Sequence, residues 1–238
     1  MIGGWKAKRF WTEVSVVQVE DGFAVQLDTR RVLTPGKHPL IVPTEAMAQA
    51  IAAEWAAQEG EIQPLTMPVT RSANSAIERV RPQRAEVAAM LAAYAETDLT
   101  CHRAGTPAAL AERQAQAWDP LLDWAAEVHG ARLIPTIGVL PVEQPQAGLA
   151  ALSDHVGALG AFHLTALHDL VTLSGSLILG LATAAGRLEP DIAWALSRID
   201  EDWQIEHWGH DEDADTAAEI KKAQFLQADR FWRLSGAR

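Results

Sequence analysis

The residues best suited to chemistry or recognition gather between positions 194 and 215. Three tryptophans, Trp194, Trp203 and Trp208, stand there among a run of Asp and Glu residues. Aromatic rings beside carboxylates offer a partner both apolar area and acceptors for its Arg or Lys side chains. The stretch therefore fits a recognition surface, although a core helix with a solvated acidic face would have the same composition.

Two histidines in this stretch raise the question of a metal site. His207 and His210 lie three positions apart, with Asp211 and Glu212 next to them. Gly209 separates the two histidines and no HExxH pattern surrounds them, so a pair of surface histidines is the stronger interpretation. We expect neither a metal nor another cofactor.

The sequence contains no recognisable catalytic motif. It has no glycine-rich phosphate loop and no GxSxG nucleophile elbow. Cys101 and His102 are neighbours, and in a strand their side chains would point to opposite faces, beyond the reach of a nucleophile and its base. Asp98 and Arg103 are expected to pair with one another or to fix a link between domains. We expect no enzyme; the alternative is a small-molecule hydrolase or transferase with an interdomain site around Asp98, His102 and Glu201.

Composition and charge narrow the class of protein. The chain has 238 residues, 48% of them hydrophobic, and a formal net charge of −11. This charge argues against nonspecific binding to nucleic acid or to anionic membranes. The single cysteine suits a reducing compartment. The first eleven residues lack the apolar core of a signal peptide, which predicts a cytoplasmic protein.

The first part of the chain has the pattern of a small sheet followed by a helix. Residues 13–20 are rich in valine, Asp21-Gly22 is a hairpin signal, and residues 23–27 alternate in polarity. Short strands are predicted at 31–34 and 40–42. Thr44 then offers an N-cap for a helix over 45–59. On that helix Trp55 shares a face with Met47 and Ile51, so we expect Trp55 to pack against the sheet, with a binding role as the alternative.

The remainder is alanine-rich and helical in pattern. The apolar run from Leu170 to Ala185 is too short and too diluted for a membrane span, so it predicts a buried helix in which Ser176 and Gly180 let a neighbouring helix come close. Leu196, Ile199 and Trp203 form an apolar stripe at helical spacing. Helices are predicted at 85–96, 108–118, 120–129, 148–158, 162–185, 190–208 and 216–232.

These elements predict an α+β fold with two domains. Residues 1–82 form a small β-rich N-terminal domain, and residues 83–238 form a larger α-helical C-terminal domain. The change in character falls after Pro82, where the alanine-rich helical pattern begins.

A set of short stretches lies in a fixed order along most of the chain. They are RFW at 9–11, the run at 25–35, IAAEWAAQ at 51–58, PLTMPVTRSANSAIERV at 64–80, TDLTCHRA at 97–104, WDPLLDWA at 118–125, SLILGLA at 176–182 and DEDWQIEHWG at 200–209. No one of them is decisive, but as an ordered set they resemble the ATP12-type family, the assembly chaperones of the F-type ATP synthase catalytic head.

The resemblance implies a chaperone that is not an enzyme and that needs no cofactor. Such a protein binds the unassembled alpha subunit and shields the surface that the beta subunit later covers. Carried over residue by residue, the functional region near the end of the chain implies partner-binding roles for Glu201, Gln204, Trp208 and Glu212. The resemblance further implies a monomer in the bacterial cytoplasm, or in the mitochondrial matrix for mitochondrial relatives, without membrane insertion.

Overall fold

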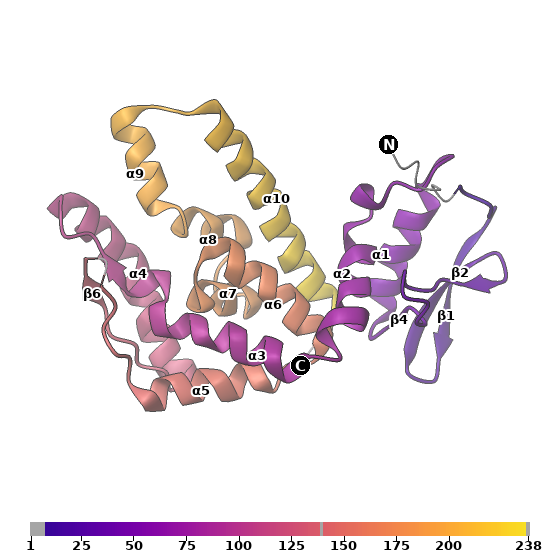
Figure 1. Cartoon of the computed structure of the whole chain (residues 1–238), viewed down its shortest axis with the longest axis horizontal. Helices are drawn as coiled ribbons and strands as arrows, with labels where there is room; N and C mark the ends of the chain where they lie inside the picture. The colour runs from indigo at the N-terminus through magenta and orange to yellow at the C-terminus, as the bar shows by residue number, and fades with distance from the viewer. Residues whose placement is uncertain (1–7, 139, 237–238) are drawn as a thin grey trace. The chain divides into compact units, whose positions relative to one another are not determined.

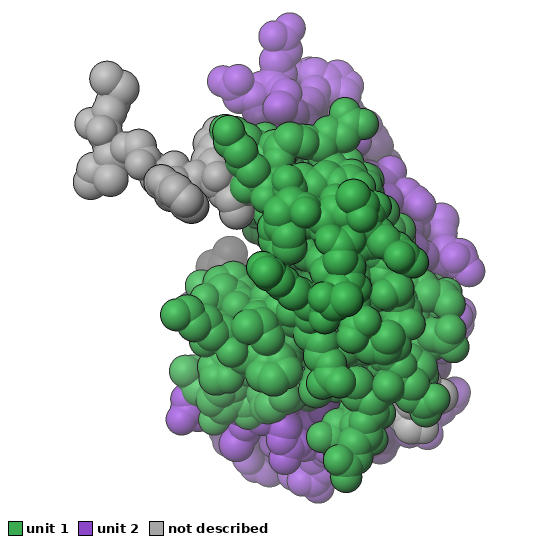
Figure 2. Space-filling view, turned by 90° about the vertical axis from the view of Figure 1, so that its right-hand side faces the viewer, with its two compact units in different colours: residues 1–83, 161–165, 230–238 green, residues 84–160, 166–229 purple. Residues whose placement is uncertain are grey.

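The computed structural model describes residues 8–138 and 140–236. The chain divides into two compact units, coloured separately in Figure 2. Unit 1 comprises residues 1–83, 161–165 and 230–238, and unit 2 comprises residues 84–160 and 166–229. The strands of the larger sheet lie early in the chain and helices dominate the rest, which confirms the α+β fold class. The domain boundary between residues 82 and 83 stays a prediction. The N-terminal segment in which no signal peptide is expected falls largely on residues 1–7, which lie outside the described residues.

The sheet of unit 1 is organised around its second strand. β1 (Val14–Val19) pairs antiparallel with β2 (Gly22–Leu27), and β2 also pairs with β3 (Arg30–Arg31) and β4 (Ile41–Val42). The predicted hairpin at Asp21-Gly22 is confirmed. Gly22 has a φ of 139°, and a Cβ at this position would lie 2.3 Å from the carbonyl oxygen of Val42. Only glycine fits where β2 passes this close to β4.

Helix α1 (Glu45–Ala56) covers this sheet, as Figure 1 shows. Its predicted N-cap is confirmed, because the Thr44 hydroxyl accepts a hydrogen bond of 3.1 Å from the Met47 N–H. Met47 and Ile51 are fully buried, and the half-buried Trp55 packs edge-on against Trp11 at 5.3 Å between ring centroids. Three short helical segments follow: a 3-10 turn (Pro64–Thr66), α2 (Pro68–Ser75) and a π-helical segment (Ala76–Val80).

Unit 2 is mainly helical and holds one short parallel strand pair, β5 (His102–Arg103) with β6 (Thr136–Ile137). Two 3-10 turns (Ala93–Thr97 and Leu99–Cys101) precede β5. Two of the helices, α6 and α10, extend from unit 2 into unit 1. The helices are α3 (Arg84–Ala92), α4 (Ala108–His129), α5 (Gln146–Gly157), α6 (Ala161–Ser174), α7 (Leu177–Ala184), α8 (Pro190–Leu196), α9 (Ile199–Trp208) and α10 (Glu212–Leu234).

The predicted break at Pro120 is wrong, since α4 runs continuously from Ala108 to His129. Proline removes the N–H that would bond the Gln116 carbonyl one turn earlier. Gln116 and Pro120 are both exposed, so water can take the place of that donor. On the opposite face Trp118 and Leu121 are buried and hold the helix together.

The single helix predicted over 162–185 is also wrong, because the chain breaks between α6 and α7. Gly175 ends α6 in the left-handed conformation, with φ 71°, and the Ser176 hydroxyl caps α7 by accepting from the Leu179 N–H at 2.9 Å. α7 is almost entirely buried, as predicted for this run. The close approach predicted at Gly180 is confirmed, since a Cβ there would lie 2.9 Å from the Val171 Cγ2. In the described chain no helix is both long and apolar enough to cross a membrane.

The helix predicted over 190–208 is two helices, α8 and α9. Arg198 separates them with φ −116° and ψ 15°, and the Ser197 hydroxyl turns back to the Trp194 carbonyl at 2.7 Å. The predicted apolar stripe survives this break. Leu196, Ile199 and Trp203 all belong to one core cluster.

Candidate functional site

Helix α9 carries most of the residues predicted to bind a partner. Asp200, Glu201 and Asp202 occupy its first turn, where carboxylates favour the positive end of the helix dipole. Gly209, with φ 90°, ends the helix as predicted. Figure 1 shows α9 and the start of α10 at the edge of unit 2. Half of the residues of α9 are exposed: Glu201, Gln204, Glu206, His207 and Trp208.

One face of α9 is buried and fixes the orientation of the other. Ile199 and Trp203 pack in a cluster with Leu110 and Trp118 of α4. The Trp118 indole N–H donates to the Leu196 carbonyl at 2.9 Å, just before α9 begins. α9 is therefore held against α4 through its apolar stripe.

The opposite face presents three of the four predicted partner-binding residues together. Glu201, Gln204 and Trp208 are exposed and lie at i, i+3 and i+7, which places them in one line on the helix. Glu212 is exposed too, but it begins α10 after the turn. Trp208 is 79% exposed, an unusual position for so large an apolar group.

The three tryptophans singled out from the sequence have different environments. Trp194 is buried and packs against Phe225 at 5.8 Å between ring centroids. Trp203 is half-buried, with the Arg113 guanidinium 4.8 Å from its ring centroid and the His207 ring stacked at 4.4 Å. Trp208 alone of the three is exposed, so Trp194 belongs to a core helix, while the recognition surface stays a prediction for the exposed part of the stretch.

Two polar contacts tie α9 to the rest of unit 2. The Arg113 guanidinium donates to both carboxylate oxygens of Glu206, at 2.8 and 2.9 Å, and this contact lowers the pKa of the Glu206 carboxyl. Gln114 is buried, and its side chain links two segments: its carbonyl oxygen accepts from the Ala104 N–H at 2.7 Å, and its amide donates to the Asp200 carboxylate at 2.5 Å. Gln114 thereby joins the end of β5 to α9.

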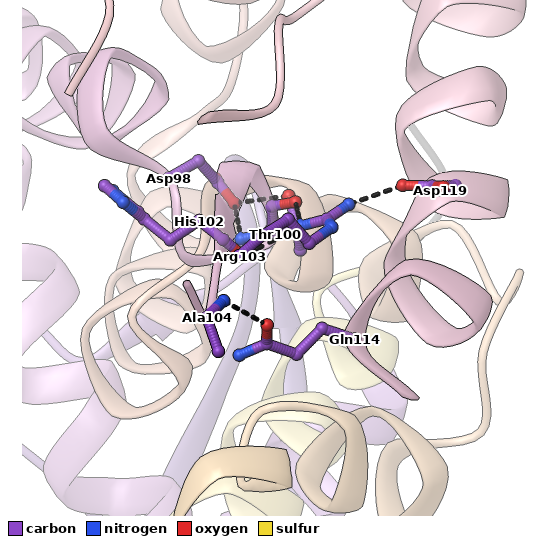
Figure 3. A network of polar contacts seen from close by, with 7 residues as sticks. All are labelled: Asp98, Thr100, His102, Arg103, Ala104, Gln114 and Asp119. Carbon is purple, nitrogen blue, oxygen red and sulfur yellow. Dashed lines mark hydrogen bonds and ion pairs between the residues drawn. The ribbon is translucent and has the colours of Figure 1, made fainter. Parts of the chain in front are cut away.

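The predicted ion pair between Asp98 and Arg103 does not form. Figure 3 shows instead that Arg103 reaches Asp119, with 2.5 Å between guanidinium and carboxylate, and donates to the Thr100 carbonyl at 2.6 Å. Asp98 lies on the other side of Thr100 and is fully buried. Arg103, which is also buried, therefore ties β5 to α4.

Asp98 accepts four hydrogen bonds from the turns around it. The donors are the Thr100 N–H and hydroxyl, the Ser176 hydroxyl and the Ile178 N–H, at 2.6 to 3.1 Å. Burial raises the pKa of the Asp98 carboxyl, while these donors oppose that shift. The carboxylate sits at the N-terminus of α7, so it stabilises a helix start in the core, and its complete burial closes it to a substrate.

Cys101 and His102 do not form a nucleophile and base. Cys101 is buried, and burial, followed by the nearby Asp98 charge, raises the pKa of its thiol to about 12. A thiol with that pKa holds its proton at neutral pH. Cys101 is therefore unsuited to act as a nucleophile.

The two histidines of the acidic stretch point to different partners. The His207 Nδ1 lies 2.8 Å from the Trp203 carbonyl oxygen, and the His210 Nδ1 lies 2.9 Å from an Asp215 carboxylate oxygen. Within the described residues, no three His, Cys, Asp or Glu side chains are grouped as metal ligands would be.

A groove runs along the side of α9 that faces β5 and the start of α4. It has a volume of about 1010 Å³, and its α9 wall contains Asp200, Trp203, Gln204, His207 and Trp208. The other wall is formed by residues 102–107 with Ala109 and Leu110, and Gly138 closes one side. His102 and Arg103 of this wall were candidates from the sequence, but the small and apolar residues beside them carry no local signal, and only the fold brings them opposite α9.

A smaller depression of about 480 Å³ lies on another side of α9. It is lined by residues 172–175 of α6 and its C-terminal turn, together with Arg198, Glu201, Gln204 and Lys221. Gln204 borders both hollows, so this predicted residue lies at the ridge between them.

Known proteins match this chain in both sequence and structure. A family model described as ATP12 chaperone protein matches residues 8–126. The crystal structure of Atp12 from Paracoccus denitrificans is 54% identical, with a TM-score of 0.95 over 98% of this chain and 100% of its own. A mutant of the same Paracoccus protein gives 53% identity and a TM-score of 0.96 over 98% and 99%. The mitochondrial protein atp12 of Schizosaccharomyces pombe is 24% identical over 219 residues, which is 87% of this chain and 75% of that protein.

Proposed function

Since the chain belongs to the ATP12 chaperone protein family, we propose that it assists assembly of the F-type ATP synthase catalytic head by binding the unassembled alpha subunit. In this role it shields the surface of the alpha subunit that the beta subunit later covers. The observation that carries the proposal is the exposed line of Glu201, Gln204 and Trp208 on α9. A tryptophan that is 79% exposed beside carboxylates is a surface suited to a partner.

The energetics of a transient chaperone fit such a surface. An ordinary specific interface covers about 800 Å² on each partner. One aromatic anchor with acidic residues around it supplies contact area and attracts cationic client residues. The binding stays moderate because exposed charged groups contribute little to affinity, so the client can be released.

The protein acts by binding and has no catalytic step of its own. Asp98, a residue of the alternative hydrolase site, is fully buried and accepts hydrogen bonds from the protein itself. Release of the alpha subunit then comes from competition by the beta subunit, without a cofactor. We place the protein, as a monomer, in the bacterial cytoplasm.

The decisive experiment is capture of separately expressed alpha and beta subunits by this chain, scored together with suppression of alpha-subunit aggregation. We expect capture of the alpha subunit alone, and loss of that capture when the beta subunit is added. Failure to bind a folded, unassembled alpha subunit would reject the proposal.

Charge reversals locate the binding face. Glu201→Lys and Glu212→Lys should each weaken capture of the alpha subunit about tenfold and leave the fold intact, because both side chains are exposed and the loss of a carboxylate from a first helical turn costs only about 1 kcal/mol. Glu127→Lys is the matched control: it makes the same charge change on the exposed C-terminal part of α4, away from α9. If all three variants bound the alpha subunit equally well, the acidic face around α9 would not be the binding surface.

A further inference from the structure

The groove beside α9 has the apolar character of a binding site and is open at its rim. Leu110, Pro107 and Trp203 contribute apolar surface, and Trp208 stands at the edge, largely exposed. Next to Gly138, Ile137 is 77% exposed, and a Cβ added to Gly105 of the groove wall would lie 3.9 Å from its Cγ2. Large apolar groups therefore lie both in the groove and next to one of its lining residues, an arrangement that favours occupation by an apolar side chain.

The charges around the groove select the kind of occupant. Arg103 lines the groove, but its charge is neutralised by Asp119, and Arg113 of α4 is neutralised by Glu206. Asp200 also lines the groove and, in the part of the chain that the structure describes, pairs with no cation. The local balance is therefore negative.

The whole of unit 2 reinforces this local balance. From its residue range, unit 2 contains eight Lys and Arg residues against 22 Asp and Glu residues, a formal net charge of −14. Unit 1 contains 12 against nine, a net charge of +3. The acidity of the protein thus resides in the unit that carries the groove, where the summed field attracts a cationic partner.

We infer that this groove binds a peptide segment of the client in which a large apolar or aromatic side chain adjoins an arginine or lysine. The apolar side chain enters between Leu110 and Trp208, and the cation meets Asp200 at the α9 wall. A volume of about 1010 Å³ leaves room for more than one side chain. This inference rests on the proposed function for the identity of the client and adds the surface and the sequence character that the groove recognises.

The groove is tested by filling it. Ala109 is exposed and lines the groove, whereas its neighbour Ala108 is equally exposed and does not. Both occupy the first turn of α4, so Ala109→Arg and Ala108→Arg place the same cation at the same helix end. We expect Ala109→Arg to weaken capture of the alpha subunit at least tenfold and Ala108→Arg to change it less than twofold. Ile137→Ser, a second variant at an exposed side chain, should weaken capture about threefold without unfolding.

The chemistry of the occupant is tested with three fluorescent twelve-residue peptides and the full chain. The first alternates Leu and Trp with Arg, the second replaces each Arg with Glu, and the third replaces each apolar residue with Ser. We expect the first to bind at least tenfold more tightly than the others, and Ala109→Arg to abolish the difference. Equal binding of the first and third peptides would reduce the site to nonspecific charge attraction and overturn the inference.

The outcomes separate this inference from the proposed function. If Ala109→Arg, Ile137→Ser and the unmodified chain captured the alpha subunit equally well, the proposed role of the groove would be rejected. The proposed chaperone function would be unaffected. Groove-dependent binding of the first peptide without any capture of the alpha subunit would support the groove and reject that client.

Discussion

At the scale of single residues, Trp55 anchors the segment before β1 to helix α1 through an aromatic contact. It packs against Trp11, and the Arg9 guanidinium lies 5.6 Å from the Trp11 ring centroid while donating to the Ala56 and Gln58 carbonyls. Trp55→Arg would remove the ring and bring a second cation close to Arg9. We expect a loss of about 3 kcal/mol in the free energy of unfolding.

Thermal unfolding followed by circular dichroism checks this expectation. The matched control is Ala53→Arg, which adds the same side chain to an exposed position of α1. The control should shift the midpoint by less than 2 °C. If Trp55→Arg had the same midpoint of thermal unfolding as the control, the packing role of Trp55 would be wrong. Its alternative, a binding role, would then be favoured.

Asp98 is a second residue whose role lies in its hydrogen bonds. All four of its partners donate, so an oxygen-only side chain suits the site. Asp98→Asn would turn an amide NH₂ toward one or more of these donors and leave them unsatisfied. We expect a loss of about 3 kcal/mol in urea unfolding, whereas Asp123→Asn on the exposed face of α4 should change stability by less than about 0.5 kcal/mol. Equal stability of the two variants would contradict the proposed network.

The sequence could mark Asp98 and Arg103 as candidates but could not find their partners. Asp98 bonds Ser176, which is 78 positions away, and Arg103 bonds Asp119, which is 16 positions away. Local periodicity carries no information about such contacts. Trp208 was recognisable because its neighbours are acidic, yet its exposure depends on which face of α9 meets α4.

At the scale of elements, α9 depends on Gln114 for its position beside the groove. Gln114→Leu keeps a similar volume but removes both hydrogen bonds and leaves the Ala104 N–H and the Asp200 carboxylate without that partner. We expect faster hydrogen exchange of the amides in α9, by about tenfold, and weaker capture of the client.

The control for this element is its exposed ion pair. Arg113→Gln removes the guanidinium that bonds Glu206, but both side chains are about half exposed, so the effect on exchange should stay within about threefold. Exchange rates that change more in Arg113→Gln than in Gln114→Leu would show that the surface pair, and not the buried amide, holds α9.

The elements themselves were largely predictable, and the errors have different causes. The hairpin, the Thr44 cap and the apolar stripe at Leu196, Ile199 and Trp203 follow from local signals and are confirmed. The break after α6 also has local signals, a glycine that ends one helix and a serine that caps the next, but the long apolar run masked them. The break at Arg198 and the continuity through Pro120 lack such signals, because there tertiary packing or solvent access outweighs local propensity.

At the scale of the whole molecule, the α+β class was predictable from the strand and helix periodicities of the sequence. The assignment of chain segments to the two compact units was not predictable. The ends of α6 and α10 belong to unit 1, where the Thr44 hydroxyl donates to the Leu234 carbonyl at 2.5 Å and Phe162 stacks on Phe231. These contacts join positions up to 190 residues apart. The groove is hidden from sequence for the same reason, since its two walls come from segments about 100 positions apart.

The uneven charge of the two units predicts how the protein finds its client. Because unit 2 carries a net charge of −14 and unit 1 of +3, electrostatic attraction of a cationic client surface should depend on the acids of unit 2. The association rate constant with the free alpha subunit, measured by stopped flow, should fall at least tenfold between 50 and 500 mM salt. Charges on the surface are screened over only about 4 Å at the higher concentration.

Two double variants of equal net charge separate the contribution of unit 2 from that of the total charge. Asp213→Lys with Glu219→Lys changes two exposed acids of unit 2, and Glu20→Lys with Glu59→Lys changes two exposed acids of unit 1. At 50 mM salt the first pair should slow association about tenfold and the second less than twofold, and both should match the unmodified chain at 500 mM. A local acidic field acts only near its own charges, so it should make the two pairs differ. Equal slowing by the two pairs would mean that the net charge of the whole protein governs the encounter.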